Sequence, residues 1–404
     1  MIKLMRAFSF LAIPLLVFAC GSDDNDVIEE PEEPWLEAIE LDLTTLTLEV
    51  TDTDTLTVIT DIDDSTVVWE SSDPDVVKVG EEGGLLALKS GTATITASVG
   101  GLTATCDVIV DLTIFVGGSA REFEAAYWKN GEINYLTITG NSEGLYSWVN
   151  NIKVLNGHLY AGGIKLEQHS IIWKDFEEII LGDGYQEVKE MATMQNEIYA
   201  VINNGNLFKL SETDELSLIK DEAHTANSIY IDKDDIYVGG ITQYGNESRP
   251  AIWKNGNELV LDYDEYTWIT DVFVSQDIFY ACGYENLGAG VVQARYWENT
   301  VKANLTEGST KALVKSIVVD DDDIYIAGSL NHRPAVWKNG EVFFYAESGI
   351  EGSIAEIIMH DGNLYAAGGL DLGTNSVGVV WKNGEEIFRT DVFDQGYINC
   401  IEIK

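Results

Sequence analysis

The stretch 316-SIVVDDDDIYIAGSLNHRPAVWKNGEVFFYA-346 contains four short candidate strands separated by turn residues. The candidates are 316–320, 323–328, 333–338 and 341–346, and they are rich in Val, Ile, Tyr and Phe. Two landmarks identify the unit. One is an aromatic residue followed by small residues, at Tyr325, and the other is the run Val-Trp-Lys-Asn-Gly that ends at Gly340.

The same unit recurs seven times after residue 112. Its aromatic landmarks, 38 to 45 residues apart, are Phe115, Tyr160, Tyr199, Tyr237, Tyr280, Tyr325 and Tyr365. Six units also have the tryptophan landmark, at Trp128, Trp173, Trp253, Trp297, Trp337 and Trp381, whereas the third has 207-LFKL-210 in its place. Four strands every ~40–45 residues are typical of a propeller blade. The sequence therefore predicts an all-β chain with a seven-bladed β-propeller over residues 112–404, and the repeated tryptophans as structural residues.

The two ends of the repeat region predict how the ring closes. The first unit begins at its second strand, 113-TIFVGG-118, with no first strand before it. The chain ends on 398-INCIEIK-404, which has the character of a first strand. We expect this tail to pair into the first blade, because a closed ring leaves no exposed sheet edge.

The N-terminus has the features of an export signal. Lys3 and Arg6 precede the apolar run 7–19, which is too short to span a bilayer and ends directly before Cys20. This resembles a bacterial lipobox, which implies cleavage after residue 19 and lipidation of Cys20; an ordinary secretory signal with a chance cysteine is the alternative. The acidic residues that follow resemble the surface-export signal of Bacteroidota lipoproteins. That resemblance implies a lipid anchor in the outer membrane and cell-surface exposure. Low apolarity and like charge predict that residues 20–37 form an extended acidic tether.

Residues 38–111 are predicted to form a separate β-sandwich. The run 92-TATITASV-99 alternates, with Ala93, Ile95, Ala97 and Val99 on one face. With 69-WESSDPDVVKV-79, 90-SGTATITAS-98 and 104-ATCDVIV-110, the segment resembles the group 2 bacterial immunoglobulin-like domain. The resemblance implies an extracellular setting, in an adhesin or as a plain spacer, and a core position for Trp69.

The net charge and the motifs of the chain restrict the classes of function that fit it. With 68 acidic and 24 basic residues the net charge is −44, which disfavours binding to nucleic acid. The five histidines show no metal-ligand spacing, and no catalytic motif is present, so we expect no metal and no cofactor. The Asp run 320–323 lacks the spacing of a calcium loop and is interpreted as a solvated turn. Cys106, Cys282 and Cys400 lie in apolar strand patterns and are predicted to be buried free thiols.

Turn chemistry divides the propeller into two faces. The Asn-Gly pairs at 130–131, 255–256, 339–340 and 383–384 predict type I′ hairpins between third and fourth strands. These turns and the short first-to-second links belong on one face. Longer links lie on the other face, where binding residues usually occur. Candidate ligand-binding residues in these longer links are Tyr146, Trp148, Tyr185, Tyr266, Trp268 and Tyr397; packing between blades is the alternative role for each.

These features predict a monomeric, non-catalytic binding protein of the cell surface, attached to the membrane through lipid on Cys20. Its ligand is expected to be a glycan or a surface protein. An adhesion or envelope-spacer protein and a glycan-active hydrolase or lyase are the alternatives. Exposed aromatics at the channel mouth would favour glycan binding, carboxylates there would favour an enzyme, and a filled mouth would favour a structural role.

Overall fold

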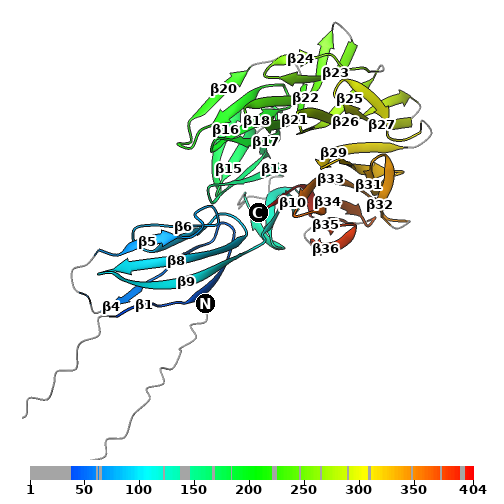
Figure 1. The fold of residues 1–404 in the computed structure, drawn as a ribbon. Helices are drawn as coiled ribbons and strands as arrows, with labels where there is room; N and C mark the ends of the chain where they lie inside the picture. The colour runs from blue at the N-terminus through cyan, green and yellow to red at the C-terminus, as the bar shows by residue number, and fades with distance from the viewer. Residues whose placement is uncertain are drawn as a thin grey trace, which may run out of the picture.

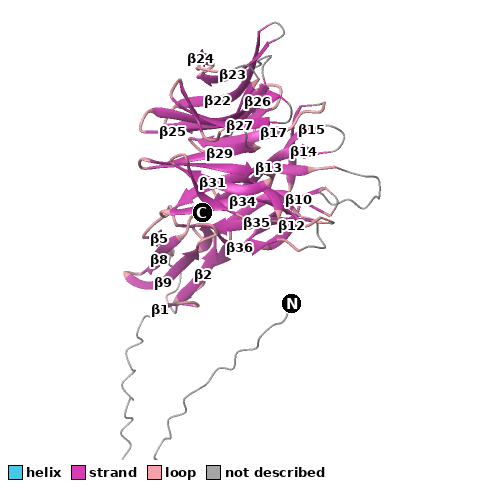
Figure 2. Cartoon of the chain, turned by 90° about the vertical axis from the view of Figure 1, so that its right-hand side faces the viewer, coloured by secondary structure: helices cyan, strands magenta, loops and turns pink. Residues whose placement is uncertain are grey.

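The computed structural model describes most of the chain from residue 38 onward. The described ranges are 38–60, 62, 66–121, 123–136, 146–165, 169–182, 184–220, 225–244, 247–263, 266–288, 291–307, 311–346, 349–373, 375–391 and 396–404. Their strands form a small sandwich followed by a ring of seven sheets (Figure 1, Figure 2). Segment 1–37, with Cys20 and the acidic tether, lies outside the described residues. Within the described part, no helix is long and apolar enough to cross a membrane.

The sandwich has one four-stranded layer, β2-β9-β8-β5, and one three-stranded layer, β3-β7-β6, while β1 and β4 pair separately. Its strands are β1 Ile39–Leu41, β2 Thr45–Glu49, β3 Thr53–Thr55, β4 Val58–Thr60, β5 Val68–Ser71, β6 Val77–Val79, β7 Gly84–Ala87, β8 Gly91–Val99 and β9 Leu102–Asp111. The predicted alternation along β8 is confirmed, because Ala93, Ile95, Ala97 and Val99 are all buried. Trp69 is half-buried against this core and covers Gly83, whose φ of 79° suits glycine.

Each of the seven sheets of the ring is a four-stranded antiparallel blade. From the channel outward, blade 1 is β37 Tyr397–Ile403, β10 Ile114–Ala120, β11 Glu124–Lys129 and β12 Glu132–Tyr135. Blade 2 is β13 Trp148–Leu155, β14 His158–Lys165, β15 His169–Lys174 and β16 Glu177–Gly182, and blade 3 is β17 Val188–Met194, β18 Glu197–Ile202, β19 Leu207–Leu210 and β20 Leu216–Lys220. Blade 4 is β21 Thr225–Asp232, β22 Asp235–Tyr244, β23 Glu247–Lys254 and β24 Asn257–Leu259.

The remaining three blades follow the same order. Blade 5 is β25 Thr267–Ser275, β26 Ile278–Gly288, β27 Val291–Glu298 and β28 Val301–Asn304. Blade 6 is β29 Ala312–Asp320, β30 Asp323–Leu330, β31 Arg333–Lys338 and β32 Glu341–Tyr345, and blade 7 is β33 Glu351–His360, β34 Asn363–Asp371, β35 Ser376–Lys382 and β36 Glu385–Arg389. The four-strand assignment made from residues 316–346 is confirmed, with the first strand beginning four residues earlier, at Ala312.

The predicted closure is also confirmed. Strand β37 pairs antiparallel with β10, with Ile403 opposite Ile114 and Cys400 opposite Gly117. The amide of Thr113 donates to the carbonyl of Lys404 at 2.9 Å, and the reverse bond measures 3.1 Å. Each inner strand contacts the inner strand of the next blade, and β33 contacts β37 to complete the circle.

Short turns define one face of the ring, which we call the turn face. Both residues of each Asn-Gly pair have positive φ, as at Asn339 (52°) and Gly340 (85°), which confirms the predicted hairpins. The asparagine has a second role, because its Oδ1 accepts the amide that opens the second strand of its own blade. These bonds of 2.8–2.9 Å join Asn130 to Ile114, Asn255 to Ile236, Asn339 to Ile324 and Asn383 to Leu364. They hold both kinds of short turn together on this face.

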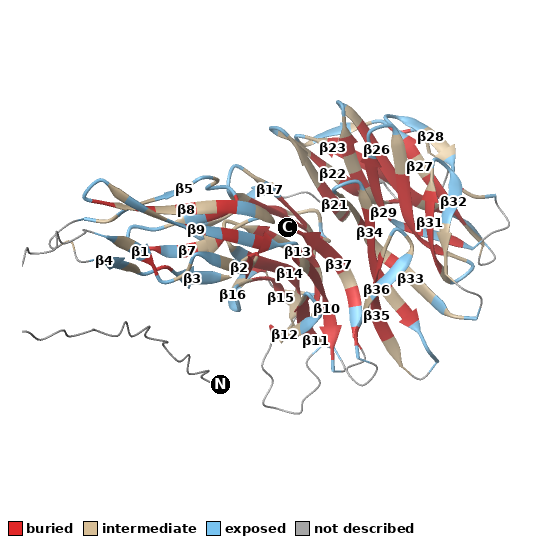
Figure 3. Cartoon of the chain, turned by 60° about the horizontal axis from the view of Figure 1, so that its bottom comes forward, coloured by how far each residue is buried: buried red, intermediate tan, exposed pale blue. Residues whose placement is uncertain are grey.

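The blades are packed through apolar side chains. All six repeated tryptophans are buried, as predicted, and Phe208 is buried at the corresponding position of blade 3. Burial is concentrated in the inner and middle strands, while outer strands such as β32 are largely exposed (Figure 3). Cys106, Cys282 and Cys400 are buried and unpaired, which confirms the thiol prediction.

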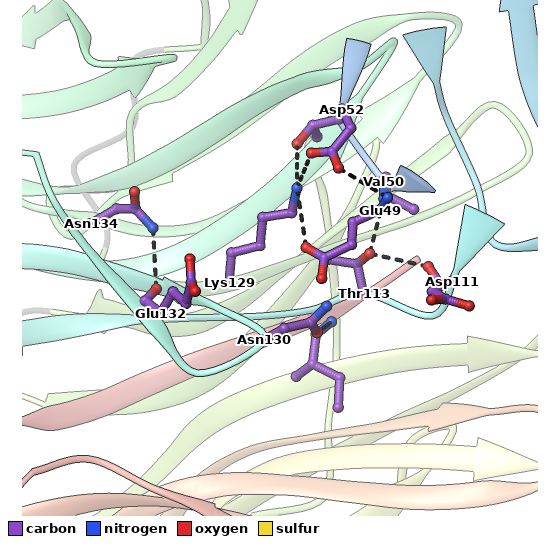
Figure 4. A network of polar contacts seen from close by, with 11 residues as sticks. Glu49, Val50, Asp52, Asp111, Thr113, Lys129, Asn130, Glu132 and Asn134 are labelled. Atoms are coloured by element: carbon purple, nitrogen blue, oxygen red, sulfur yellow. Dashed lines mark hydrogen bonds and ion pairs between the residues drawn. The ribbon is translucent and has the colours of Figure 1, made fainter. Parts of the chain in front are cut away.

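The sandwich docks on the turn face at blades 1 and 2. Lys129, from the repeated Trp-Lys motif, forms ion pairs with Asp52 at 2.6 Å and Glu49 at 3.4 Å, and the Thr113 hydroxyl accepts the amide of Val50 at 2.9 Å (Figure 4). In blade 6 the equivalent lysine, Lys338, instead pairs with Asp323 of its own blade at 2.7 Å. Blade 1 has Thr113 where blade 6 has Asp323, so Lys129 is available to the sandwich.

We expect deletion of residues 398–404 to lower the melting temperature strongly, because it removes the inner strand of blade 1 and reopens the ring. Differential scanning calorimetry of the truncated and full chains tests this. Deleting residues 22–36 of the acidic segment is the control, and it should leave the melting temperature unchanged. An unchanged transition in the 398–404 deletion would contradict closure by this strand.

Candidate functional site

Every inner strand contains a β-bulge at an equivalent position, near the end opposite the turn face. A bulge redirects the side chain of the extra residue. Six of these extra residues are polar or charged. Going round the ring from blade 2, the bulged residues are Asn150, Lys189, Asn227, Thr270, Lys315, Ala355 and Asn399. All seven line one cavity of about 430 Å³, which we call the mouth cavity, on the face opposite the turns, which we call the loop face.

The residue that follows the bulge forms a hydrogen bond between neighbouring blades. In six blades its side chain accepts a backbone amide of the following inner strand, with distances of 2.7–3.2 Å. The pairs are Asn151 with Met191, Glu190 with Ile229, Ser228 with Val272, Asp271 with Ile317, Ser316 with Ile357 and Glu356 with Ile401. The seventh position is Cys400. These seven positions form what we call the polar ring.

Three carboxylates of the polar ring have displaced pKa values. Burial raises the pKa of Glu356 to about 7, against which the charge of Lys153 acts. Burial likewise raises the pKa of Asp271 to about 6, opposed by the amides of Ile317 and Val272. The pKa of Glu190 is also raised, by burial and then by the charges of Asp271 and Glu356. Ser228 and Ser316 separate these acids on one side of the ring, and Cys400 and Asn151 separate Glu356 from Glu190 on the other, so no two acids occupy adjacent positions.

The polar ring divides the channel into two cavities. Glu190, Asp271, Ser316 and Glu356 line both the mouth cavity and a second cavity of about 360 Å³ toward the turn face. In the second cavity Lys153 lies 3.5 Å from Glu402, which supplies a local counter-charge. No group of three or more His, Cys, Asp or Glu side chains in the described ranges is placed to hold a metal ion.

Aromatic residues form one wall of the mouth cavity. Trp268 of β25 and Tyr284 of β26 occupy directly paired positions and stack with their ring centroids 5.3 Å apart and an interplanar angle of 26°. Both rings line the cavity. An aromatic face beside polar groups is a common arrangement in small-molecule sites, because the ring supplies contact area and the polar groups orient the ligand.

Asparagine side chains supply hydrogen-bonding groups around the same cavity. Their Nδ2 atoms donate to strand carbonyls of the next blade: Asn150 to Val188, Asn227 to Ile269 and Asn399 to Val149, at 2.7–2.9 Å. These bonds use the amide nitrogen and leave the Oδ1 acceptor available. The cavity wall is therefore rich in hydrogen-bond acceptors that have a fixed orientation.

Trp148 is part of a neighbouring polar cluster centred on Glu187. The carboxylate of Glu187 accepts the indole N–H of Trp148 and the Nδ2 of Asn150, both at 3.0 Å, and pairs with Lys189. The opposing effects of burial, which raises the pKa of Glu187, and of Lys189, which lowers it, leave that pKa below its usual value. Trp148 is thus held in place beside the cavity and is absent from its lining.

The other predicted aromatics are dispersed over the loop face. Tyr146 and Tyr397 lie on either side of Phe123, with centroid distances of 5.1 and 6.3 Å, and are 52% and 42% exposed. Tyr185 is 76% exposed and Tyr266 is 64% exposed. Of the six predicted ligand-binding residues, Trp268 alone lines the mouth cavity.

The bulged residues and the polar ring were not predicted from the sequence. A signal for them exists, because six of the seven first strands contain a polar residue at this position within an apolar run, and the seventh has Cys400. The positions are Asn151, Glu190, Ser228, Asp271, Ser316, Glu356 and Cys400. The pattern becomes visible once the seven first strands are aligned with one another.

Comparison with known proteins identifies the sandwich. Residues 36–108 match the family model of the bacterial Ig-like domain (group 2). The sandwich is therefore a group 2 bacterial Ig-like domain. No curated protein matches the chain.

Solved structures resemble the chain at low identity. A quinonprotein alcohol dehydrogenase-like protein from Bacteroides thetaiotaomicron has a TM-score of 0.45 and 14% identity, covering 88% of this chain and 95% of that chain. The WD40 β-propeller domain of Doa1 has a TM-score of 0.43 and 12% identity, covering 66% and 88%. A chain of the nidogen–laminin complex has a TM-score of 0.41 and 10% identity, covering 72% and 98%. At these identities the likeness is one of fold and extends to no binding or catalytic property.

The polar ring makes stability depend on pH. The pKa of Glu356 rises from 4.5 to about 7 on folding, so between these pH values the folded chain binds a proton that the unfolded chain has released. Its contribution to the free energy of unfolding therefore falls as pH rises through this window. We expect Glu356→Gln, which still accepts the amide of Ile401, to raise the melting temperature at pH 8 by a few degrees and to change it less at pH 5.

Glu351→Gln is the matched control, because Glu351 is exposed on the same strand, β33. This control should give similar shifts at both pH values. Thermal unfolding followed by circular dichroism is the measurement. A Glu356→Gln shift that is equal at pH 5 and pH 8 would show that the carboxyl does not titrate in this window.

Proposed function

We propose that the protein is a non-catalytic, cell-surface binding protein that holds a glycan in the mouth cavity. The observation that supports this most is the stacked pair of Trp268 and Tyr284 in the same cavity as the oriented amides of Asn150, Asn227 and Asn399. Sugar rings have apolar faces that stack on aromatic rings and hydroxyl groups that donate to acceptors. The open cavity offers both, with the aromatic rings on blade 5 and the amides on blades 1, 2 and 4.

The expected affinity of such a site is modest. Burying ~150 Å² of apolar surface on the two rings contributes ~4 kcal/mol, which corresponds to about millimolar binding. Affinity of this order suits a protein displayed in many copies against a repetitive polymer, because linked sites bind more tightly together than singly.

The arrangement of the two domains supports display on a lipid anchor. The sandwich, which follows the proposed tether and Cys20, contacts the turn face through Lys129 and Thr113. The mouth cavity lies on the opposite face of the ring. In our proposal a chain attached at Cys20 to the outer membrane presents the loop face away from its point of attachment.

A glycan-active hydrolase is the second candidate, and the polar ring is the observation that favours it. Asp271 and Glu356 line the mouth cavity with pKa values raised to about 6 and about 7, in the range suited to a general acid near neutral pH. Each of them also binds a backbone amide, and Ser228, Ser316 and Asn151 make the same bond without any acid. The shared bond gives the carboxylates a structural role, so binding is the favoured proposal.

Substitution of the aromatic wall tests the binding proposal. We expect Trp268→Ala to lower the affinity for any glycan found on an array by at least about tenfold, because it removes half of the stacking surface. Trp268→Phe should lose less. Phe176→Ala is the control, since Phe176 is an exposed aromatic in a turn of the opposite face, and it should leave binding unchanged. If the glycans found on the array bind the Trp268→Ala variant as tightly as the wild type, the proposal that they bind in the mouth cavity is wrong.

Product formation separates the two candidates. If the protein only binds, the wild type and the variants Asp271→Asn and Glu356→Gln will all release no reducing ends from bound polysaccharide during prolonged incubation. Release by the wild type that both variants abolish would establish the hydrolase instead. Melting temperatures of the variants check that each one is folded.

A further inference from the structure

Lys315 differs from the other cations of the channel. It is the bulged residue of β29 and lines the mouth cavity, as Lys189 does from β17. The ammonium of Lys189 is bound by Glu187, and Lys153, deeper in the channel, lies beside Glu402. Among the described residues Lys315 has no hydrogen-bond or ion-pair partner. Lys315 is therefore a cation at the surface of the mouth cavity whose charge no described acid pairs with.

The surroundings of Lys315 leave its charge uncompensated. The Lys315 side chain is exposed at the surface of the cavity, and partial desolvation by the surrounding cavity wall lowers its pKa, with no neighbouring acid acting against that effect. The polar-ring acids of the two adjacent blades form no ion pair with Lys315 in the described part of the chain. One oxygen of Asp271 accepts the amide of Ile317, and one oxygen of Glu356 accepts the amide of Ile401. An anion entering the cavity would supply the missing counter-charge, with a charge-assisted hydrogen bond.

The aromatic wall is next to this lysine. Trp268 and Tyr284 belong to blade 5, Lys315 belongs to blade 6, and the inner strands β25 and β29 of these blades contact each other. A ring that stacks on Trp268 therefore lies beside the Lys315 ammonium. Asn227, on the other side of blade 5, has its Nδ2 bound to Ile269 and presents an acceptor for hydroxyl groups.

We infer that the mouth cavity selects a sugar residue that carries a negatively charged group, which binds the ammonium of Lys315. The shared chemistry is an anion on a sugar ring, either a carboxylate or a sulfate. This inference rests on the proposed glycan binding and adds the class of sugar to it.

Two matched pairs of short oligosaccharides test the inference by isothermal titration calorimetry on the mature chain. Trigalacturonate is compared with its trimethyl ester, and sulfated maltotriose with maltotriose. A buffer of about 0.15 M salt has a Debye length of about 8 Å, which screens the distant negative surface of the protein. We expect an acidic member to bind at least about tenfold more tightly than its neutral partner. Which pair shows the difference identifies carboxylate or sulfate.

Substitutions at Lys315 and at a control lysine test whether Lys315 causes the preference for the acidic oligosaccharide. Lys315→Met should reduce the affinity for the acidic oligosaccharide at least about tenfold, whereas Lys315→Arg keeps the charge and should retain most of it. Lys311→Met is the matched control, because Lys311 is an exposed lysine just before the same strand and does not line the cavity. Acidic binding by Lys315→Met equal to that of the wild type would overturn the inference.

The outcomes separate this inference from the proposed function. If acidic and neutral members bind equally and Trp268→Ala weakens both, glycan binding stands and charge selection is wrong. If neither pair binds at millimolar concentration and Trp268→Ala affects no glycan on an array, both proposals fall.

Discussion

The antiparallel pairing of β37 with β10 is the constraint on which the propeller depends. It joins the last residues of the chain to the first blade and completes a circle of seven inner strands. Because the inner strands converge on one axis, their facing side chains share a narrow space, which contains the two cavities. Apolar residues fill the spaces between blades. Along the channel, side chains lie close to other polar groups and need hydrogen-bond partners.

The bulges and the polar ring meet that requirement. Six of the seven bulges direct an additional polar side chain into the channel, and in six blades the side chain of the next residue accepts an amide of the neighbouring blade. Cross-blade bonds of this kind orient the inner strands relative to one another, whereas apolar packing sets their spacing. No two of the acids Glu190, Asp271 and Glu356 occupy adjacent positions of the ring, although the charges of Asp271 and Glu356 still raise the pKa of Glu190. The same bonds leave the mouth of the channel open and lined with oriented acceptors, which is the basis of the proposed site.

The first blade differs from the others because it serves two domains. Its Lys129 comes from the repeated motif that in blade 6 forms a pair within the blade, yet here it binds Asp52 and Glu49 of the Ig-like domain. A single change, threonine at position 113 where blade 6 has Asp323, frees this lysine and supplies the hydroxyl that accepts the amide of Val50. The contact occupies the turn face and leaves the loop face unobstructed. The residues that repeat in each blade therefore form the propeller scaffold. The position at which blade 1 departs from the repeat forms the contact with the Ig-like domain.

The sequence alone was enough to predict the repeat architecture, the closing strand, the Asn-Gly turns and the Ig-like domain. These features depend on local periodicity, on turn residues with positive φ and on motifs that are contiguous in the chain. Each of these signals lies within a single strand or hairpin. It did not show which loop aromatics share a cavity. Trp268 and Tyr284 lie on two strands, and Asn227 and Lys315 come from the blades on either side. Tertiary structure decided that grouping, because only the closed ring brings residues of successive blades, about 40 positions apart in the chain, to one axis.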